Sequence, residues 1–280
     1  MITELRQEHF PLDKLLALGK LSRSTYYYYC KHLSQPDKYA TIKELIVLIF
    51  ERNKGRYGYR RICAELRRSG CKINHKTVQK LMKSMELQGK QKKSKYRSYK
   101  GTVGKVASNV LDRNFHSQKP FEKLVTDVTE FKVCNERVYL SPVMDLFSHE
   151  IVAHSISLHP TFSQIREMLY KLFTKLPPDE MPLLHSDQGW QYQMSEYQEM
   201  LKQHNITQSM SRKGNCLDNS VMENFFGRLK TEMFFGETFS SVKDFIQKLE
   251  EYNCYFNNER ISLTLNGMSP VEYRTHFSVI

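Results

Sequence analysis

The stretch HSDQGWQY, His185 to Tyr192, follows the short apolar run MPLLHS, in which a strand is expected to end and a loop to begin. It places the carboxylate of Asp187 at that strand end and follows it with a glutamine, a glycine and Trp190, the only tryptophan of the chain. Taken alone, an aspartate before a glycine is an ordinary turn residue. Its meaning therefore depends on whether other acidic residues converge on the same place.

The sequence on either side of this stretch predicts strands and helices in alternation. Three consecutive segments are rich in β-branched and aromatic residues and are separated by turn signals, which predicts three strands: KLVTDVTEFKV, RVYLSPVMDLF and IVAHSISL. Two further short strands, MPLLHS and ITQSM, alternate with the helical segments FSQIREMLYKLFTKL and MSEYQEMLKQHN. A long helix from about Leu217 or Asn219 to Met233 follows, and another runs from Ser241 to about Asn257. This order predicts an α/β fold with a mixed sheet.

The first ninety residues predict short helices. Within RYGYRRICAELRRSGCKINHKTVQKLMKSMEL, a helix from about Tyr59 to Arg68 ends at a glycine, and a second helix begins near His75 with Asn74 as its N-cap. Two helices joined by a tight turn are typical of a helix-turn-helix, although a small helical bundle that binds nothing has the same pattern. We expect a helical N-terminal region over residues 1–87, with the helix-turn-helix at about 55–87.

Positive charge is concentrated after this region. The chain has a formal net charge of +12, and the segment from Lys80 to Lys123 holds nine of these charges, because it contains twelve Lys or Arg residues and three acidic ones. Such a stretch suggests a polyanionic partner, most often nucleic acid; the alternative is a solvated linker without a partner. We assign residues 88–122 to a basic linker, and residues 123–280 to the α/β core with a helical C-terminal tail.

Composition excludes some classes of protein. No apolar run approaches the roughly 18 residues of a membrane helix, and the N-terminus has no signal-peptide pattern. The six cysteines are scattered without a CxxC pair, which argues against a zinc module and favours reduced thiols in a cytoplasm. We therefore expect a cytoplasmic protein without a membrane partner.

Three acidic residues occupy positions suited to chemistry. Asp127 lies in the first predicted strand, Asp187 follows the fourth, and Glu223 lies on the long helix with 35 residues between it and Asp187. Carboxylates on rigid elements suit Mg²⁺, and two such ions about 3.5–4 Å apart can activate an attacking oxygen and stabilise a leaving one at a phosphodiester. Lys230, seven residues after Glu223, lies two helical turns along the same face, where it could hold a substrate phosphate.

Each of these acids also has an ordinary structural interpretation. Asp127 could be a strand-edge acid, Asp187 a turn former and Glu223 one partner of a surface salt bridge. Two other acids on the predicted strands, Glu130 and Asp145, compete for the site. Strand alternation puts Glu130 on the face opposite Asp127, whereas Asp145 remains a candidate neighbour.

Taken together, the motifs resemble a known family. TDVTEF, HSDQGWQY and DNSVMENFFGRLKTE are similar to the three catalytic blocks of insertion-sequence transposases with a retroviral-integrase-like DDE core, in which the third acid follows the second after 35 residues and a Lys or Arg lies seven beyond it. RYGYRRICAELRRSGCKINHKTVQKLM resembles the helix-turn-helix before that core, and YNCYFNNERISLTLNGMSPVEY resembles its C-terminal tail. LLALGKLSRSTYYYY resembles the start of the second-frame, OrfB-type protein of two-frame elements. His149 and Leu124 depart from the commoner Arg and Trp, which affects packing rather than the acids.

The resemblance implies a ribonuclease-H-like core in which Asp127, Asp187 and Glu223 bind two Mg²⁺ or Mn²⁺ ions. It implies a DNA transposase that cuts at the terminal inverted repeats of its element, exposes a 3′-hydroxyl and joins that end to another phosphodiester. The implied partners are double-stranded DNA at the terminal repeats and at the target, further copies of the chain on that DNA, and the upstream-frame protein or its frameshift fusion. The implied location is a bacterial cytoplasm, in association with the nucleoid.

Two other functions stay open. A related metal-dependent nuclease would cut strands without joining them, and a DNA-binding regulator of transposition would not need the acids. Arg60, Arg61, Lys76 and Lys80 are the candidates for DNA contact in the helix-turn-helix, with Lys230 in the core. A joined DNA product separates the transposase from the nuclease, and substitution of the acids separates it from the regulator.

Overall fold

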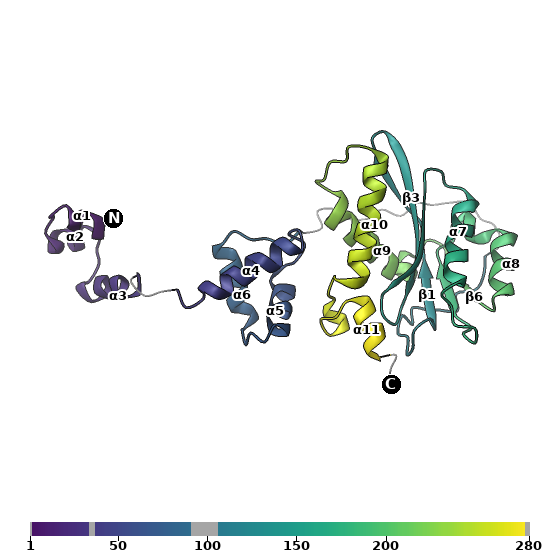
Figure 1. Cartoon of the computed structure of the whole chain (residues 1–280), viewed down its shortest axis with the longest axis horizontal. Coiled ribbons are helices and arrows are strands. Elements are labelled where there is room, and N and C mark those ends of the chain that lie inside the picture. Colours follow the sequence, from purple (N-terminus) through teal and green to yellow (C-terminus); the bar gives the residue numbers. More distant parts are fainter. Residues whose placement is uncertain (1, 34–36, 91–105, 278–280) are drawn as a thin grey trace.

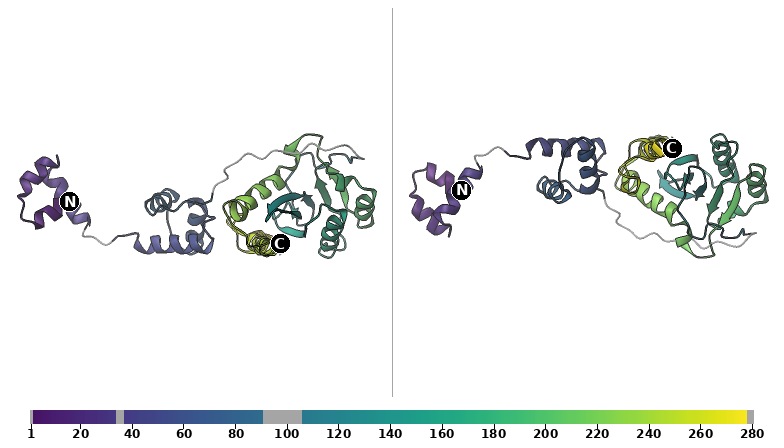
Figure 2. Two further views of the ribbon diagram at one scale, coloured as in Figure 1. Left: turned by 90° about the horizontal axis from the view of Figure 1, so that it is seen from above. Right: turned by 90° about the horizontal axis from the view of Figure 1, so that it is seen from below.

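The computed structural model describes residues 2–33, 37–90 and 106–277. Along the sequence these residues form a group of short helices, a helix-turn-helix module and an α/β core (Figure 1). The first group consists of α1 (Ile2–Gln7), α2 (Leu12–Leu18) and α3 (Arg23–Leu33), and Figure 2 shows it at one end of the molecule, apart from the other two parts. None of the helices in these three ranges is both long enough and apolar enough to cross a membrane.

The helix-turn-helix module has the helices that the sequence predicts. It contains α4 (Ala40–Arg52), α5 (Tyr59–Arg68) and α6 (His75–Ser84), which pack against one another. Gly70 ends α5 with a φ of +86°, a left-handed conformation that glycine adopts without steric cost. Asn74 caps α6, because its side-chain oxygen accepts a hydrogen bond from the backbone N–H of the second helical residue at 2.9 Å.

The core contains a mixed six-stranded sheet. Its strands are β1 (Lys123–Thr126), β2 (Thr129–Val133), β3 (Glu136–Asp145), β4 (Ile151–Ser157), β5 (Leu183–Ser186) and β6 (Thr207–Met210). The long strand β3 pairs antiparallel with β4 along one edge and with both β1 and β2 along the other. β5 pairs in parallel with β1, and β6 pairs in parallel with β5. The α/β class predicted from the sequence is therefore correct.

The segment predicted as one strand, KLVTDVTEFKV, is divided into β1 and β2. Both strands keep a single register against β3, and in that register Pro142 stands opposite Asp127. A proline has no amide hydrogen to donate, and the carbonyl of Pro142 accepts a hydrogen bond from Thr126 Oγ1 at 2.9 Å. The ladder therefore opens at residues 127–128, and Asp127 stands at a strand end rather than inside a strand.

Helices cover both faces of the sheet (Figure 1). α7 (Phe162–Phe173) and α8 (Ser195–Gln203) lie on one face, while α9 (Ser220–Leu229) and α10 (Val242–Asn258) lie on the other. The long helix predicted as far as Met233 is composite, because α9 follows a 3₁₀ turn, Cys216–Asn219, and continues into a π-helical turn, Lys230–Phe234. A short 3₁₀ turn, Leu263–Leu265, and α11 (Pro270–Phe277) complete the described chain.

The predicted basic linker begins to pack before its expected end. Residues 91–105 lie outside the described residues, and residues 106–122 run against the core. The backbone N–H groups of Val110 and Leu111 both donate to Ser209 Oγ on β6, at 2.9 and 3.1 Å. Leu111 is buried in the hydrophobic cluster beneath α9 and α10, so this half of the linker belongs structurally to the core.

The C-terminal segment after α10 packs into the helix-turn-helix module. Ile261 is buried in the same hydrophobic cluster as Ile62 and Leu66 of α5. Its N–H donates to the hydroxyl of Tyr57 at 2.9 Å, and both residues are shielded from solvent. The domain division predicted from the sequence assigned this segment to the core alone, whereas its side chains help to form the core of the module.

A buried ion pair lies where the module meets the core. Arg260 is 2% exposed and donates from Nε and Nη2 to the two carboxylate oxygens of Glu232, at 2.8 and 2.6 Å. Tyr252 donates its hydroxyl to the same carboxylate at 3.0 Å. Burial raises the pKa of Glu232, but the Arg260 guanidinium outweighs this effect and lowers it overall. The side chain of Glu232 belongs to the π-helical turn that follows α9, so the module is joined to that helix.

We expect Glu232→Ala to destabilise the protein strongly, because it leaves the buried guanidinium of Arg260 without a partner. The loss should be about 3–5 kcal/mol in the free energy of unfolding, measured by urea denaturation. The matched control is Glu259→Ala, which removes an exposed carboxylate 3.8 Å from Arg52 and should cost less than about 1 kcal/mol. Equal losses in the two variants would contradict the importance of the buried pair.

Candidate active site

The sheet brings two of the three predicted acids side by side. Val125 of β1 pairs with His185 of β5 in parallel register. Asp127 and Asp187 each lie two residues beyond this pair, immediately after the last residue of their strands. Since adjacent parallel strands are about 4.8 Å apart and their carboxyl ends meet at one edge, the two aspartates emerge next to each other.

Local hydrogen bonds orient both carboxylates. Asp127 is 9% exposed, and its Oδ1 accepts the Val128 N–H at 2.7 Å. Asp187 Oδ1 accepts the Gly189 N–H at 2.8 Å. A Cβ atom at Gly189 would lie 2.5 Å from Gln191 Nε2 and 2.9 Å from Asp187 Oδ1, so a side chain there would displace the Gln191 amide and the Asp187 carboxylate. The glycine of the HSDQG stretch therefore allows the backbone to close tightly over the aspartate.

The third acid comes from α9, which is tied directly to the end of β1. Asn219, just before α9, donates from Nδ2 to the carbonyl of Thr126 at 3.2 Å. Glu223 lies one helical turn further along. In the alternation of β1 and β2, Val125 and Phe131 share the face of Asp127, and both pack in the hydrophobic cluster formed with α9. Asp127 thus faces the helix that carries Glu223.

Electrostatics link the three carboxylates. Burial raises the pKa of Asp127 well above its usual range, and the negative charges of Asp187 and Glu223 raise it further. Burial also raises the pKa of Asp187, against the Gly189 N–H that lowers it. The nearby ammonium group of Lys230 only partly offsets the effect on Asp127. The site therefore carries excess negative charge.

The donor set fits a hard divalent cation. Its ligands would be carboxylate oxygens, which Mg²⁺ and Mn²⁺ prefer, and a cation would compensate the negative charge that raises the pKa of Asp127. Within residues 2–33, 37–90 and 106–277, no three His, Cys, Asp or Glu side chains are grouped closely enough to hold a metal ion. Asp127 and Asp187 are thus the paired part of the site, with Glu223 approaching from α9.

Lys230 lies on the Asp127 side of the core. It is the first residue of the π-helical turn, and its Nζ is 5.1 Å from the centre of the Phe131 ring. Burial lowers its pKa, while the carboxylates of Glu130 and Asp127 oppose that shift. π-helical turns are often found at functional sites. The lysine therefore faces the acids, although the helix leaves regular α geometry before reaching it.

The two competing acids have other roles. Glu130 is exposed on β2 and forms an ion pair with Arg137 at 3.2 Å. Asp145 is buried and pairs with Leu124 at the opposite end of β1 from Asp127. Its carboxylate accepts hydrogen bonds from the N–H and hydroxyl of Ser148, at 3.1 and 2.8 Å. Asp145 therefore stabilises a turn and is not a neighbour of the aspartate pair.

The four helix-turn-helix cations divide into two groups. Arg60, Lys76 and Lys80 are exposed. Arg61 instead lies at the contact with the core, where its Nη1 is 4.0 Å from Glu232 Oε1. Only 24% of the Arg61 side chain is exposed, and this burial lowers its pKa. The sequence pattern treated the four alike, because only the tertiary structure shows that the core covers one of them.

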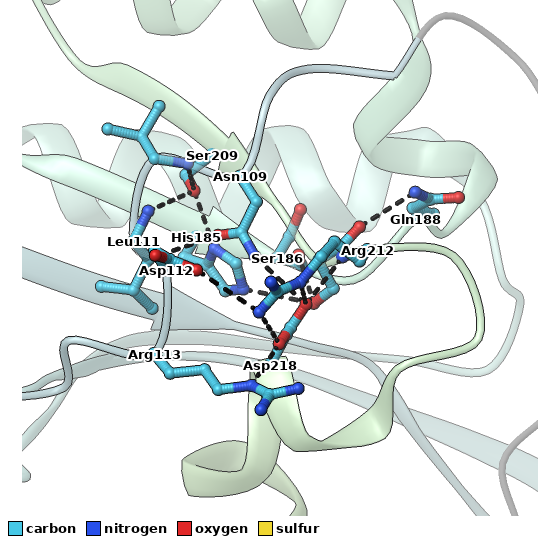
Figure 3. A network of polar contacts seen from close by, with 12 residues as sticks. Asn109, Leu111, Asp112, Arg113, His185, Ser186, Gln188, Ser209, Arg212 and Asp218 are labelled. Atoms are coloured by element: carbon cyan, nitrogen blue, oxygen red, sulfur yellow. Dashed lines mark hydrogen bonds and ion pairs between the residues drawn. The ribbon is translucent and has the colours of Figure 1, made fainter.

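A fourth acid, Asp218, is fully buried at the start of the α9 region (Figure 3). Its Oδ1 accepts from Arg113 Nε at 2.8 Å and from Arg212 Nη2 at 2.9 Å. Its Oδ2 accepts from Arg212 Nε at 2.9 Å and from Asn109 Nδ2 at 3.1 Å. The Arg212 guanidinium, helped by Arg113, holds the pKa of Asp218 well below its usual range. Asp218 is thus saturated with donors and serves as an anchor rather than a metal ligand.

His185, two residues before Asp187, forms a second anchor, and Figure 3 shows its ring beside Ser209. Its ring nitrogens lie 2.8 Å from Ser209 Oγ and 3.2 Å from Ser211 Oγ. Burial lowers the pKa of His185 to about 4, so the ring is neutral at physiological pH. The histidine therefore bridges β5 to β6 without adding charge.

Sequence reasoning missed the roles of Asp218 and Asn219. Both lie in the quoted block DNSVMENFFGRLKTE, directly before α9. Short polar residues at such positions are typical of helix starts and their anchoring hydrogen bonds, and this signal could have identified them as supports. Their partners, Thr126 and the arginines, are too distant in the sequence to be found in the same way.

We expect Asp127→Asn to stabilise the metal-free protein at pH 7. The raised pKa means that ionisation of Asp127 costs the folded state free energy above about pH 4, where the unfolded carboxyl ionises. Asparagine removes this cost and keeps the oxygen that accepts the Val128 N–H. The melting temperature in EDTA should rise, by about 2–4 °C for each kcal/mol gained. A lower melting temperature would contradict the excess negative charge.

Asp218→Asn should have the opposite effect, a loss of about 2 kcal/mol at pH 7, because charge-assisted hydrogen bonds are weakened. A lowered pKa contributes stability above the unfolded value near 4, and this contribution is lost as pH falls through the folded value. The difference in melting temperature between native and variant should therefore be constant from about pH 5 to 8 and shrink below about pH 4. The control Asp112→Asn removes an exposed partner of Arg212 at 3.4 Å and should change the melting temperature little. A melting-temperature difference between native protein and Asp218→Asn that stays the same below about pH 4 would refute the role of ionised Asp218.

Comparison with known proteins agrees with the fold and the module order. The chain matches the HTH-like domain family over residues 37–95 and the integrase core domain families over residues 117–216 and 223–277. It is 52% identical over 274 residues to the putative transposase InsK for insertion sequence element IS150 of Escherichia coli (strain K12), covering 98% of this chain and 96% of that protein. It is 38% identical to the probable transposase for insertion sequence element IS1353 of Shigella flexneri, covering 95% of this chain and 52% of that protein.

A solved structure of the simian T-cell lymphotropic virus intasome, in complex with PP2A regulatory subunit B56 gamma, contains a similar chain. The TM-score is 0.48 at 14% identity, over 75% of this chain and 73% of that chain. The sequence predictions of a ribonuclease-H-like integrase core and of a helical module before it are confirmed by the domain matches. The chain belongs to the insertion-sequence transposases, enzymes of the polynucleotidyl transferase type with an HTH-like domain and an integrase core.

Proposed function

We propose that this transposase cleaves the ends of its insertion sequence and joins them to DNA by two-metal phosphodiester transesterification. Asp127, Asp187 and Glu223 would hold two Mg²⁺ or Mn²⁺ ions. The observation that carries the proposal is the parallel pairing of β1 with β5, which puts the buried Asp127 and the partly buried Asp187 side by side near the helix that carries Glu223. Bound cations would supply activation of the attacking oxygen and stabilisation of the leaving oxygen.

The side chains of the site prepare it for this chemistry. The Val128 and Gly189 N–H groups each bind one oxygen of an aspartate, which would leave the second oxygen for a ligand. Because Asp127 has a raised pKa and a metal ligand must be deprotonated, cation binding would favour its ionised form and would weaken as the pH falls. The Asn219 hydrogen bond to Thr126 holds the start of α9 against β1 and so limits where Glu223 can lie.

The DNA substrate would be held by cations from both parts of the chain. Lys230 lies close enough to Asp127 to affect its pKa and is suited to a phosphate near the aspartates. Arg60, Lys76 and Lys80 are exposed on α5 and α6, where they can reach a duplex. Arg61 is left out of this proposal, since it faces Glu232. These contacts would serve both the terminal inverted repeats and the target DNA.

The active assembly would contain more than one copy of the chain on DNA, because two element ends must be processed together. We further propose that the upstream-frame protein, or its frameshift fusion to this chain, takes part. The length of the IS1353 relative supports this, since this chain matches 52% of it. Its DNA substrate puts the enzyme at the nucleoid of a bacterial cytoplasm.

The test is a cleavage and joining assay in Mg²⁺ or Mn²⁺ on DNA that carries the element's ends. We expect Asp187→Asn to reduce joined product by on the order of 10³-fold or more, because the acids act as one catalytic unit. Asparagine keeps the oxygen that accepts the Gly189 N–H, so the turn should be retained, and the melting temperature and duplex binding would be measured on the same samples.

The matched control is Glu130→Gln, which neutralises an exposed carboxylate on the neighbouring strand and should leave joining close to native. Cleavage without joining in the native chain would favour a metal-dependent nuclease. Joining that survives Asp187→Asn would refute the assignment of the acids. If the native chain binds DNA but is inactive, repeating the assay with the upstream-frame fusion separates an incomplete transposase from a regulator of transposition.

A further inference from the structure

Trp190 belongs to the HSDQGWQY motif, but the proposed chemistry does not use it. It is the only tryptophan of the chain, lies three residues after Asp187 and is 53% exposed. Its neighbours Gln191 and Tyr192 in the same 3₁₀ turn are buried. The turn therefore packs one side into the core and presents the indole ring on the other.

The backbone that carries this ring is held at several points. The Tyr192 N–H donates to the Gly189 carbonyl at 3.1 Å, and the Tyr192 carbonyl accepts from Gln208 Nε2 at 2.7 Å. Gln193 Nε2 donates to the Gln188 carbonyl at 2.5 Å. With the Gly189 N–H bound to Asp187, the indole and the carboxylate belong to one rigid turn. The backbone position from which the ring projects is consequently set relative to the aspartate.

Positive charge lies next to this turn. Gln188 Nε2 donates to the carbonyl of Ser211 at 2.9 Å, and the Ser211 N–H donates to the Ser186 carbonyl at 2.9 Å. The next residue, Arg212, lies beside Gln188 in Figure 3; its side chain is 49% exposed, and its guanidinium is paired with Asp218. Lys213, which follows it, is exposed as well and is the cation better suited to contact a phosphate. An exposed aromatic ring beside cations is the combination by which proteins bind unpaired nucleotides, through stacking on the base and contact with the phosphate.

We propose that Trp190 stacks on a base that has left the duplex, next to the phosphodiester that the aspartate pair processes. This inference rests on the proposed function, because it requires DNA at Asp127 and Asp187. An unpaired base is the expected occupant, since a base inside a duplex has both faces covered by its neighbours, whereas a strand end at a cleavage site can separate. Trp190 would thereby favour DNA ends that open over those that stay paired.

The lone tryptophan makes the proposal directly measurable. The probes are two duplexes that carry the element's end, one fully paired and one with the last three nucleotides unpaired, titrated into the full chain in Ca²⁺ so that binding is followed without turnover. We expect quenching of tryptophan emission that saturates together with DNA binding measured by anisotropy. The duplex with the unpaired end should bind more tightly and quench more.

Variants at the position give the second measurement. Trp190→Ala should bind the paired duplex like the native chain and lose roughly 5- to 150-fold in affinity for the unpaired end, the range of one stacked base. Trp190→Phe should recover most of that loss, because it keeps an aromatic face. The matched control is Phe235→Ala, which removes another exposed aromatic ring, 51% exposed, and should not change the preference.

Several results would overturn the inference. Saturable DNA binding without quenching, or an unchanged preference in Trp190→Ala, would show that no base stacks there. If DNA does not quench the native chain and Trp190→Ala changes the sedimentation coefficient of the protein, the ring would be assigned to a protein contact instead. Joined product from a chain that shows no quenching would reject the stacking role and leave the proposed function intact. Loss of all binding to element ends in the native chain would reject both.

Discussion

The close approach of two carboxylates, one buried and one partly buried, is the constraint that the rest of this core accommodates. Asp127 and Asp187 leave adjacent parallel strands at the same edge of the sheet, and burial and neighbouring negative charge raise the pKa of Asp127. A fold gains nothing in stability from such a pair. The sheet can hold them together because the β1–β5 ladder and the surrounding hydrophobic clusters contribute far more than the repulsion costs. Buried acids that destabilise the fold in this way are characteristic of functional sites.

Two polar residues near the aspartate pair hold the neighbouring elements in position. Asp218 and His185 both lie close to the elements that carry the candidate acids, and both have lowered pKa values, which have opposite consequences for their charge. Asp218 is saturated by arginine donors, so it stays ionised and fixes the start of the α9 region. His185 stays neutral and bridges two strands through serine hydroxyls. The charge of Asp218 is compensated and His185 is neutral, so both residues support the structure. The negative charge around Asp127, in contrast, is only partly compensated by Lys230.

The helix-turn-helix module and the core share an interior rather than meeting only through a linker. Ile261 from the C-terminal segment fills the core of the module, and Arg260 beside it binds Glu232 just beyond α9. The same helix carries Glu223. A buried ion pair thus links the segment that fills the module to the turn at the end of that helix. This arrangement also explains why Arg61, in spite of its position in the module, is covered.

Local patterns were sufficient for much of the architecture. Gly70 and Asn74 mark the turn of the helix-turn-helix because φ and capping preferences act over a few residues. The alternation of strands and helices predicts the class of the core for the same reason, and the spacing of Asp187, Glu223 and Lys230 carried the resemblance to the family. The division of one predicted strand at Asp127 was missed, since it depends on Pro142 standing opposite in another strand.

What the tertiary structure alone decided concerns contacts between residues distant in the chain. Asp145 does not belong to the site, because the antiparallel register places it at the far end of β1. Arg61 differs from the exposed cations of the module because Glu232, well over a hundred residues later, lies against it. Asp218 became an anchor only when Asn109, Arg113 and Arg212 met around it. Local propensity follows from the sequence over short ranges, whereas burial and charge pairing depend on packing between elements, and these decide which of several similar residues can take part in the site.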